Sequence, residues 1–405
     1  MSVRSVLALR TFWYPENGPG TRRFASFCRG LNNAGYEVTL LALSNPNPFF
    51  DSSTSNDACE SGHAVLLPHR VQPNSIRYRI ERKLVHPLFP QFRYNRKANR
   101  LVQEKASELL QKKSFGAILT TYGPLGSLAI AEKLSRGFDV PWVADLRDLP
   151  DQFDEERKNW AVRREAEMLG MCCAKAAHVL TVSEPLKARL EQDYGLRVPI
   201  SVVYNGYESP PWSPKEEETP SPEFPISYFG TIYAGRSPEL LFAGLELLRN
   251  AGVSLDGVSV RFFGRSGYVA PAECSKKSHE LIQNWGMLEP KKALEVQRES
   301  AVLLSLASPG AKGVLTSKIF EYAMAGRPVL SIPADDNGLD DFVHRSGVGY
   351  VCDTPAHVAS RLAPLLKKWR ETGYLPGVSP DLDYLQAFSR DAQAKKVCEV
   401  MTTLI

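Results

Sequence analysis

The sequence predicts an α/β protein built from two doubly wound domains, each a parallel sheet flanked by helices. Short apolar, β-branched segments alternate along the chain with segments of helical apolar spacing. This alternation stops at 208–224, which is rich in Pro, Glu and Ser, and then begins again. At 405 residues the chain also exceeds one typical core, which favours two domains.

The first domain, predicted over 1–207, opens with a strand, a helix and a second strand. A buried strand near its start leaves into the Pro/Gly turn 15–21. Phe24, Phe27 and Leu31 then follow with helical spacing, and the strand 37–43 comes next. Similar units continue, with a long helical stretch over about 154–175. Repeated units of this kind build parallel sheets.

The segment 208–224 lacks apolar periodicity and is predicted to be an extended linker. The α/β pattern restarts over 225–385, the second domain, and 386–405 reads as an amphipathic helix after a polar loop. Two such domains are expected to face each other across a cleft. Ligands of doubly wound sheets bind at the carboxyl ends of the strands, so that is where we expect the site.

Composition is that of a soluble globular protein, with 43% hydrophobic residues and a net charge of +4. The seven cysteines show no CxxC spacing and are expected to be reduced thiols, and no cluster with metal-ligand spacing occurs. The apolar run near residue 1 is too short for a signal peptide, and no run approaches the roughly 18 apolar residues of a spanning helix. We therefore expect a cytoplasmic protein, or one that lies on the inner membrane surface.

A basic segment, 76–105, carries nine Lys/Arg against two Glu, with aromatic residues interleaved. One interpretation is a solvated basic helix. Another is a surface for anionic lipid headgroups or an anionic acceptor, because basic groups attract such headgroups while aromatics enter the interface. Nucleic-acid binding is the third and least supported, because no recognised module accompanies the segment.

Three glycine-containing loops follow predicted strands, at 17–23, 229–238 and 263–267. Loops of this kind let phosphate oxygens reach backbone N–H groups at a helix start. Arg236 and Arg265 lie in two of them, and Arg236 could donate to a diphosphate. The alternative is that Arg236 only caps a surface turn.

Charged residues also follow the strand that ends near 145. Asp145, Arg147 and Asp148 either face the cleft and contact acceptor hydroxyls, or Asp145 is locked by Arg147 as a structural pair. His178, which opens a strand, is expected to be structural rather than a catalytic base.

The segment 313–330, GVLTSKIFEYAMAGRPVL, places Lys318 and Glu321 on one face of a helix. Thr316 and Ser317 are candidates for its N-cap. Lys318 and free N–H groups suit a diphosphate, and Glu321 could accept hydrogen bonds from a ribose diol. The alternative is an ordinary packed helix with a Lys–Glu ion pair.

Several segments together resemble a known family. They are 14–42, 143–148, 176–208, 228–245, 284–308, 388–401 and, most specifically, TSKIFEYAMAGRPVL at 316–330. In these segments the chain resembles the GT-B glycosyltransferases, specifically the retaining, sugar-nucleotide-dependent enzymes of family 4.

The resemblance implies a nucleotide-binding second domain, acceptor contacts from the first domain, and a last helix that crosses back to the first domain. It implies no metal and no cofactor, because cationic side chains and a helix start neutralise the leaving diphosphate. It implies that Glu321 binds the ribose, that Arg236 and Lys318 bind the diphosphate, that Met287 and Leu288 meet the base, and that Gly18 to Gly20 lie near the phosphate and donor sugar. From the loops and the helix start, the candidate nucleotide-binding residues also include Gly230, Arg265, Thr316 and Ser317. The candidate catalytic residues are Asp145, Arg147, Asp148, Arg236 and Lys318.

Two departures leave details open. The family often has an earlier glutamate that contacts the donor sugar, where this chain has Gly313, and a first-domain histidine where this chain reads DLRD. The expected activity is transfer of a sugar from a nucleotide diphosphate to a hydroxyl of a polysaccharide, lipid-linked glycan or other acceptor, with retention. The alternatives are a degenerate, non-catalytic scaffold and a sugar-nucleotide epimerase. A nicotinamide oxidoreductase is disfavoured by the lack of GxGxxG.

Overall fold

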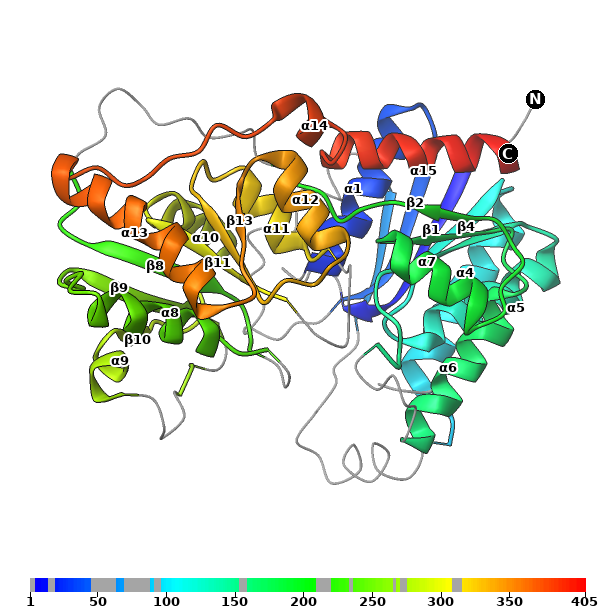
Figure 1. The fold of residues 1–405 in the computed structure, drawn as a ribbon. Helices are drawn as coiled ribbons and strands as arrows, with labels where there is room; N and C mark the ends of the chain where they lie inside the picture. Colours follow the sequence, from blue (N-terminus) through cyan, green and yellow to red (C-terminus); the bar gives the residue numbers. More distant parts are fainter. Residues whose placement is uncertain are drawn as a thin grey trace. The chain divides into compact units, whose positions relative to one another are not determined.

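The computed structural model describes residues 4–13, 19–44, 63–68, 88–90, 96–152, 159–208, 220–232, 236–264, 267–269, 275–307 and 315–405. The chain separates into two compact units (Figure 1). Unit 1 is Met1–Asn205 together with Arg390–Ile405, and unit 2 is Gly206–Ser389.

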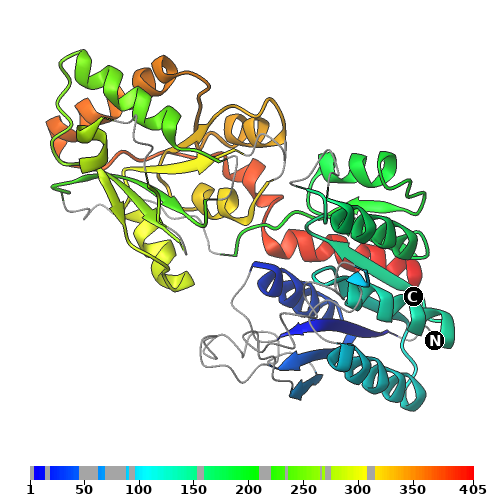
Figure 2. The ribbon, with the colours of Figure 1, turned by 90° about the horizontal axis from the view of Figure 1, so that it is seen from below.

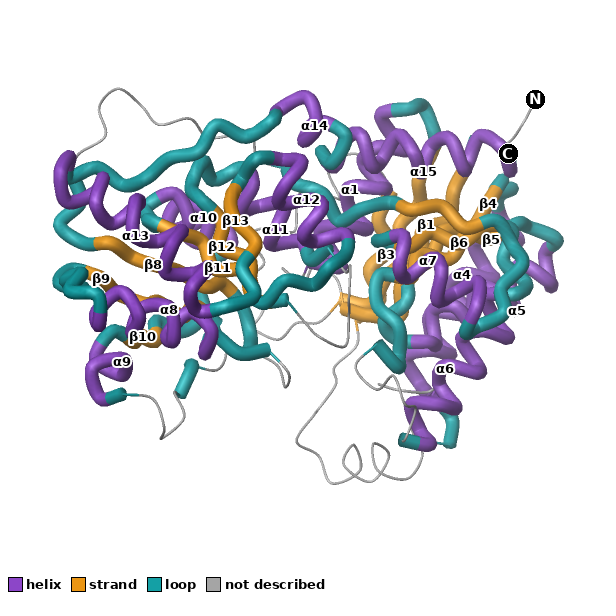
Figure 3. Tube along the Cα trace, viewed as in Figure 1, coloured by secondary structure: helices purple, strands orange, loops and turns teal. Residues whose placement is uncertain are grey.

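Unit 1 is built on a seven-stranded sheet in the order β3-β2-β1-β4-β5-β6-β7, in which every pairing is parallel. Figure 3 shows its strands in orange and its helices in purple. Its strands are β1 (Ser5–Trp13), β2 (Glu37–Ser44), β3 (His63–Pro68), β4 (Ala117–Thr121), β5 (Trp142–Leu146), β6 (His178–Thr181) and β7 (Ile200–Val202). Its helices are α1 (Pro19–Asn33), α4 (Arg96–Lys112), α5 (Leu125–Phe138), α6 (Trp160–Cys173), α7 (Glu184–Gln192) and α15 (Arg390–Leu404).

The last helix, α15, completes the core of unit 1 (Figure 2). Val397, Val400 and Met401 pack in one cluster with α1 and with strands of the sheet. Gly30 on α1 allows this close approach, because a Cβ there would lie 2.4 Å from the Cβ of Ala394. Residues from the two ends of the chain therefore share one apolar core.

Unit 2 holds a six-stranded parallel sheet in the order β10-β9-β8-β11-β12-β13. Its strands are β8 (Phe224–Phe229), β9 (Val258–Phe263), β10 (Ile282–Asn284), β11 (Val302–Leu306), β12 (Val329–Ile332) and β13 (Gly349–Val351). Its helices are α8 (Glu239–Asn250), α9 (Lys276–Glu280), α10 (Pro290–Arg298), α11 (Ser317–Ala323), α12 (Gly338–Ser346), α13 (Pro355–Thr372) and α14 (Leu382–Gln386).

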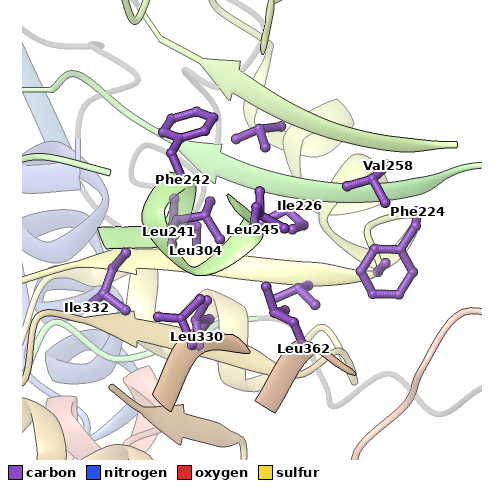
Figure 4. Packing of buried hydrophobic residues seen from close by; sticks show 14 of the residues in the cluster. Phe224, Ile226, Leu241, Phe242, Leu245, Val258, Leu304, Leu330, Ile332 and Leu362 are labelled. Carbon is purple, nitrogen blue, oxygen red and sulfur yellow. The ribbon is translucent and has the colours of Figure 1, made fainter. Parts of the chain in front are cut away.

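Alternate residues of the unit 2 strands contribute to a large apolar cluster. Phe224 and Ile226 of β8 lie in this cluster with Leu241 and Leu245 of α8 and Leu362 of α13 (Figure 4), and Tyr228 of β8 belongs to the same cluster. In this sheet the order in which successive strands are added reverses between the neighbouring strands β8 and β11, and in unit 1 it reverses between β1 and β4. The carboxyl ends of the strands at these reversals are where doubly wound sheets bind ligands.

The two doubly wound parallel sheets predicted from the sequence are confirmed. The long helix expected over 154–175 is described from Trp160 to Cys173, with Asn159 as its N-cap, and 153–158 lie outside the described residues. Most of the expected linker, at 209–219, also lies outside them, as do 76–87 and 91–95 of the basic segment.

Candidate active site

The candidate site of unit 2 begins at Gly230, directly after β8. This residue has φ +132°, and a Cβ there would lie 1.7 Å from Nζ of Lys318. Only glycine therefore leaves room for the ammonium group above the end of β8. The Gly230 N–H donates to the Phe263 carbonyl at 2.6 Å, and Gly264 approaches Gly230 so closely that a Cβ would lie 2.3 Å from its carbonyl oxygen.

Lys318 is largely buried beside a second cation and a carboxylate. Burial, the larger cause, and the neighbouring Arg236 together lower its pKa to about 8, while Glu321 opposes the shift. The ammonium also lies 5.3 Å from the centroid of the Tyr228 ring. The structure thus brings together four residues singled out in the sequence: Gly230, Arg236, Lys318 and Glu321. Two cations held this close to each other favour an anionic ligand over any other.

Helix α11 is fixed to the sheet by a buried tyrosine. The Tyr322 hydroxyl accepts a hydrogen bond from the Phe229 N–H at 3.0 Å, and the Tyr322 side chain is fully buried. Thr316 occupies the N-cap position of α11, as the sequence suggested, but its side chain makes no capping hydrogen bond. The first backbone N–H groups of α11 consequently receive no side-chain oxygen from Thr316.

The residues expected near the base follow β10. Met287 is 66% exposed and Leu288 is partly buried, so both are accessible at this edge of unit 2. Arg265, Gly18 and Gly313 lie outside the described residues, and the predicted roles of Arg265 and Gly18 stay predictions.

The structure corrects the interpretation of Asp145 in unit 1. Its carboxylate is not paired with Arg147 and does not reach the surface. Arg23 of α1 donates to it from Nε at 3.1 Å and from Nη2 at 2.8 Å, and the Thr121 hydroxyl donates to it at 3.0 Å. Arg23 also donates to the Tyr204 carbonyl at 2.8 Å. This buried network ties α1 to β4, β5 and the end of β7, so we interpret Asp145 as structural rather than catalytic.

Arg147 and Asp148 remain at the surface of unit 1. The Arg147 guanidinium donates to the Asp148 carboxylate at 2.9 Å from Nε and at 2.7 Å from Nη2. It also packs against Gly20, where a Cβ would lie 2.5 Å from Nη1. A guanidinium therefore lies at the start of α1, where an anionic substrate group would also be attracted.

Sequence reasoning missed Arg23, which turns out to be 1% exposed. It lies four residues before Phe27, and its guanidinium carbon is 4.7 Å from the centroid of that ring. This spacing places Arg23 on the inward face of α1 and was a signal that it faces the core.

Within the described parts of the chain, no group of three or more His, Cys, Asp and Glu could hold a metal ion. In the same parts, no helix is both long enough and apolar enough to cross a membrane.

Two parallel doubly wound sheets, with a last helix that belongs to the first unit, are typical of the GT-B class, and solved structures of that class align with this chain along its length. They include sucrose-phosphate synthase from Thermosynechococcus elongatus (14% identity, TM-score 0.66, covering 99% of this chain and 98% of that one) and HepE from Anabaena in complex with UDP and glucose (12%, 0.62, 98% and 99%). A third is the lipopolysaccharide outer core galactosyltransferase WaaB (14%, 0.57, 99% of each chain). At these identities the likeness establishes the fold, and the predicted GT-B fold is confirmed.

The family resemblance has its own support. Residues 20–209 match the model of the family described as Glycosyltransferase Family 4, which confirms the predicted resemblance over those residues. The match agrees with the predicted class of enzyme, a glycosyltransferase. No curated protein sequence matches this chain.

Proposed function

We propose that this protein transfers a sugar from a nucleotide-diphosphate donor to a hydroxyl acceptor, with retention of the anomeric configuration. The observation that carries the proposal is the cluster of Arg236, Lys318 and Glu321 over Gly230, at the carboxyl end of β8. The family match over 20–209 and the UDP and UDP-glucose complexes of the similar protein HepE support it.

In this proposal the cations of unit 2 act on the leaving group. When the bond between sugar and diphosphate breaks, negative charge grows on the diphosphate, and Lys318 and Arg236 stabilise it. Lys318 acts as the charged ammonium, because only that form compensates the phosphate charge. These cations can supply the neutralisation that a bound metal would otherwise provide, so we propose a metal-independent and cofactor-independent reaction.

Glu321 is assigned to the ribose. It lies on α11 beside Lys318, close enough to oppose the lowering of the Lys318 pKa. A carboxylate can accept two hydrogen bonds from a vicinal diol, which fixes the nucleoside relative to the diphosphate. Glu321 thereby positions the donor while Lys318 and Arg236 stabilise the charge.

The finer proposal for the acceptor is a polysaccharide or lipid-linked glycan presented at an anionic surface. Leu88 and Phe89 are 51% and 45% exposed, and Trp160 at the start of α6 is 50% exposed. Arg164, one turn after Trp160, donates to the Leu88 carbonyl at 3.0 Å, so the two segments lie side by side. Exposed aromatic and aliphatic groups beside arginines are suited to a membrane interface.

Measuring nucleotide release with a panel of UDP-, GDP- and dTDP-sugars tests the activity. Glu321→Ala should weaken donor binding by at least tenfold, about 1.4 kcal/mol. If no donor binds and Glu321→Ala changes nothing, the proposal is wrong. Donor binding without transfer or hydrolysis would favour the alternative of a non-catalytic scaffold.

The acceptor surface is tested separately by co-sedimentation with vesicles that contain anionic lipid. Binding should fall as salt rises, because headgroup attraction is screened. Trp160→Ala should reduce it, and absence of binding would count against a membrane-presented acceptor.

A further inference from the structure

Three aromatic rings form a row across the carboxyl edge of the unit 2 sheet. Phe229 of β8 pairs in register with Phe263 of β9, and Asn284 pairs with Phe262, which places Trp285 beside Phe263. The Phe229 and Phe263 centroids are 4.7 Å apart with planes 10° apart, and those of Phe263 and Trp285 are 6.1 Å apart with planes 26° apart.

The two inner rings and the outer ring differ in exposure. Phe229 and Phe263 are each 6% exposed, whereas Trp285 is 57% exposed. Trp285 follows β10, the strand at the edge of the sheet. The indole therefore has Phe263 on its inner side and a large surface open to solvent, which is unusual for a side chain that gains most from burial.

The indole is held in place by two further contacts. Its Nε1–H donates to the Gln283 side chain at 3.2 Å, and the Arg261 guanidinium carbon lies 5.7 Å from the ring centroid. Arg261 is itself anchored by an ion pair with Glu223. Trp285 is consequently a fixed, exposed aromatic surface. Binding of a planar ligand would cost little conformational entropy, because the indole is already ordered.

The row also leads away from the cation cluster. Lys318 lies over Gly230, the residue after Phe229, and Trp285 lies two strands further along the sheet. Adjacent strands are about 4.8 Å apart, so the ammonium and the indole are separated by roughly 10 Å along this direction. That separation is comparable to the reach of an extended nucleoside diphosphate from its terminal phosphate to its base.

We propose that the exposed face of Trp285 stacks the planar base of the donor nucleotide, while Lys318 and Arg236 hold its diphosphate. This inference rests on the proposed function, because it concerns the same donor. Stacking uses the π-face that every base has, so Trp285 contributes affinity without selecting between purine and pyrimidine.

Calorimetric titration of wild type, Trp285→Ala and Trp285→Phe with UDP, GDP and inorganic pyrophosphate tests this. We expect Trp285→Ala to lose about tenfold in affinity for each nucleoside diphosphate that the wild type binds, with pyrophosphate unchanged, and Trp285→Phe to keep most of the affinity. Tyr374→Ala is the matched control, because Tyr374 is also an exposed aromatic residue of unit 2 but follows α13 rather than a strand of the sheet.

If the wild type binds nucleoside diphosphate and Trp285→Ala binds it equally well, the inference is wrong and the proposed function is unaffected. A wild type that binds no nucleoside diphosphate overturns the proposed function, and the inference with it. An equal loss for pyrophosphate and nucleotides in Trp285→Ala would show general damage rather than lost stacking, and also counts against the inference. Quenching of indole fluorescence by UDP or GDP that disappears in Trp285→Phe supports it independently.

Discussion

At the scale of residues, Lys318 combines an unfavourable contribution to folding stability with the binding role proposed for it. Its pKa is lowered to about 8 from 10.5 because burial and Arg236 both disfavour the charged form. The unfolded chain thus binds more protons than the folded protein between these two values, and the contribution of Lys318 to folding stability rises with pH through this window. A bound diphosphate reverses the balance, because it favours the ammonium.

We therefore expect affinity for UDP or GDP to fall as pH rises above about 8, the pKa of Lys318 in the free protein. Titrations between pH 7 and 10 in two buffers of different ionisation enthalpy measure both the affinity and the protons taken up. Lys318→Met should remove the proton uptake and weaken binding at pH 7. Unchanged affinity across this range would contradict the assigned role.

Asp145 is expected to stabilise the fold of unit 1. Asp145→Ala leaves the buried Arg23 guanidinium without its carboxylate, and the expected loss is about 3 to 5 kcal/mol in the free energy of unfolding. Asp148→Ala is the control, because its ion pair with Arg147 is exposed and should change stability by about 1 kcal/mol or less. Denaturant unfolding measures both losses. Equal losses would show that the buried network contributes no more to stability than the exposed ion pair does.

At the scale of elements, the turn after β8 determines where the cation of α11 can lie. Gly230→Ala would put a Cβ 1.7 Å from Lys318 Nζ and should displace that side chain. We expect affinity for nucleoside diphosphates to fall by at least tenfold, about 1.4 kcal/mol.

Gly252→Ala is the control that separates displacement of the Lys318 side chain from backbone strain. Gly252 also has a positive φ, +82°, but a Cβ there meets nothing within 4 Å. Both variants should lose about 1 kcal/mol of stability from the left-handed backbone, and only Gly230→Ala should lose nucleotide affinity. Equal affinity in the two variants would contradict the proposed position of Lys318.

Sequence patterns predicted the helices and strands more accurately than they predicted the side-chain contacts. The alternation of apolar strands and amphipathic helices predicted both parallel sheets, and the polar residues of 316–321 predicted the grouping of Lys318 and Glu321. Asp145 was misjudged because a charge at the end of a strand can face either solvent or the core, and its partner Arg23 lies far away in the sequence. The aromatic row was missed for a similar reason, because it depends on the register of three strands.

At the scale of the whole molecule, the chain passes between the units twice, after Asn205 and after Ser389. The packing of α15 against α1 links the two parts of unit 1. Gly30→Ala should lower the stability of unit 1 by about 1 to 3 kcal/mol, because the new methyl group overlaps Ala394.

A second substitution tests this contact directly. Ala394→Gly in the Gly30→Ala background should recover part of the loss, and the double-mutant cycle isolates the contact. Gly137→Ala, also in a helix but with open space around it, should be neutral or stabilising by up to about 1 kcal/mol. Thermal unfolding of the four variants measures these differences, and strictly additive effects would contradict the contact.

The late position of α15 in the sequence also has a kinetic consequence. A ribosome adds roughly 5 to 20 residues per second, so the stretch 206–389 occupies on the order of 10 to 40 s between the synthesis of β7 and that of α15. During that interval, the apolar residues of α1 that pack with Val397 and Met401 in the folded protein lack these partners. Unit 2 is one continuous segment, and its last residue is synthesised before α15. We therefore expect unit 2 to finish folding before unit 1 on the ribosome.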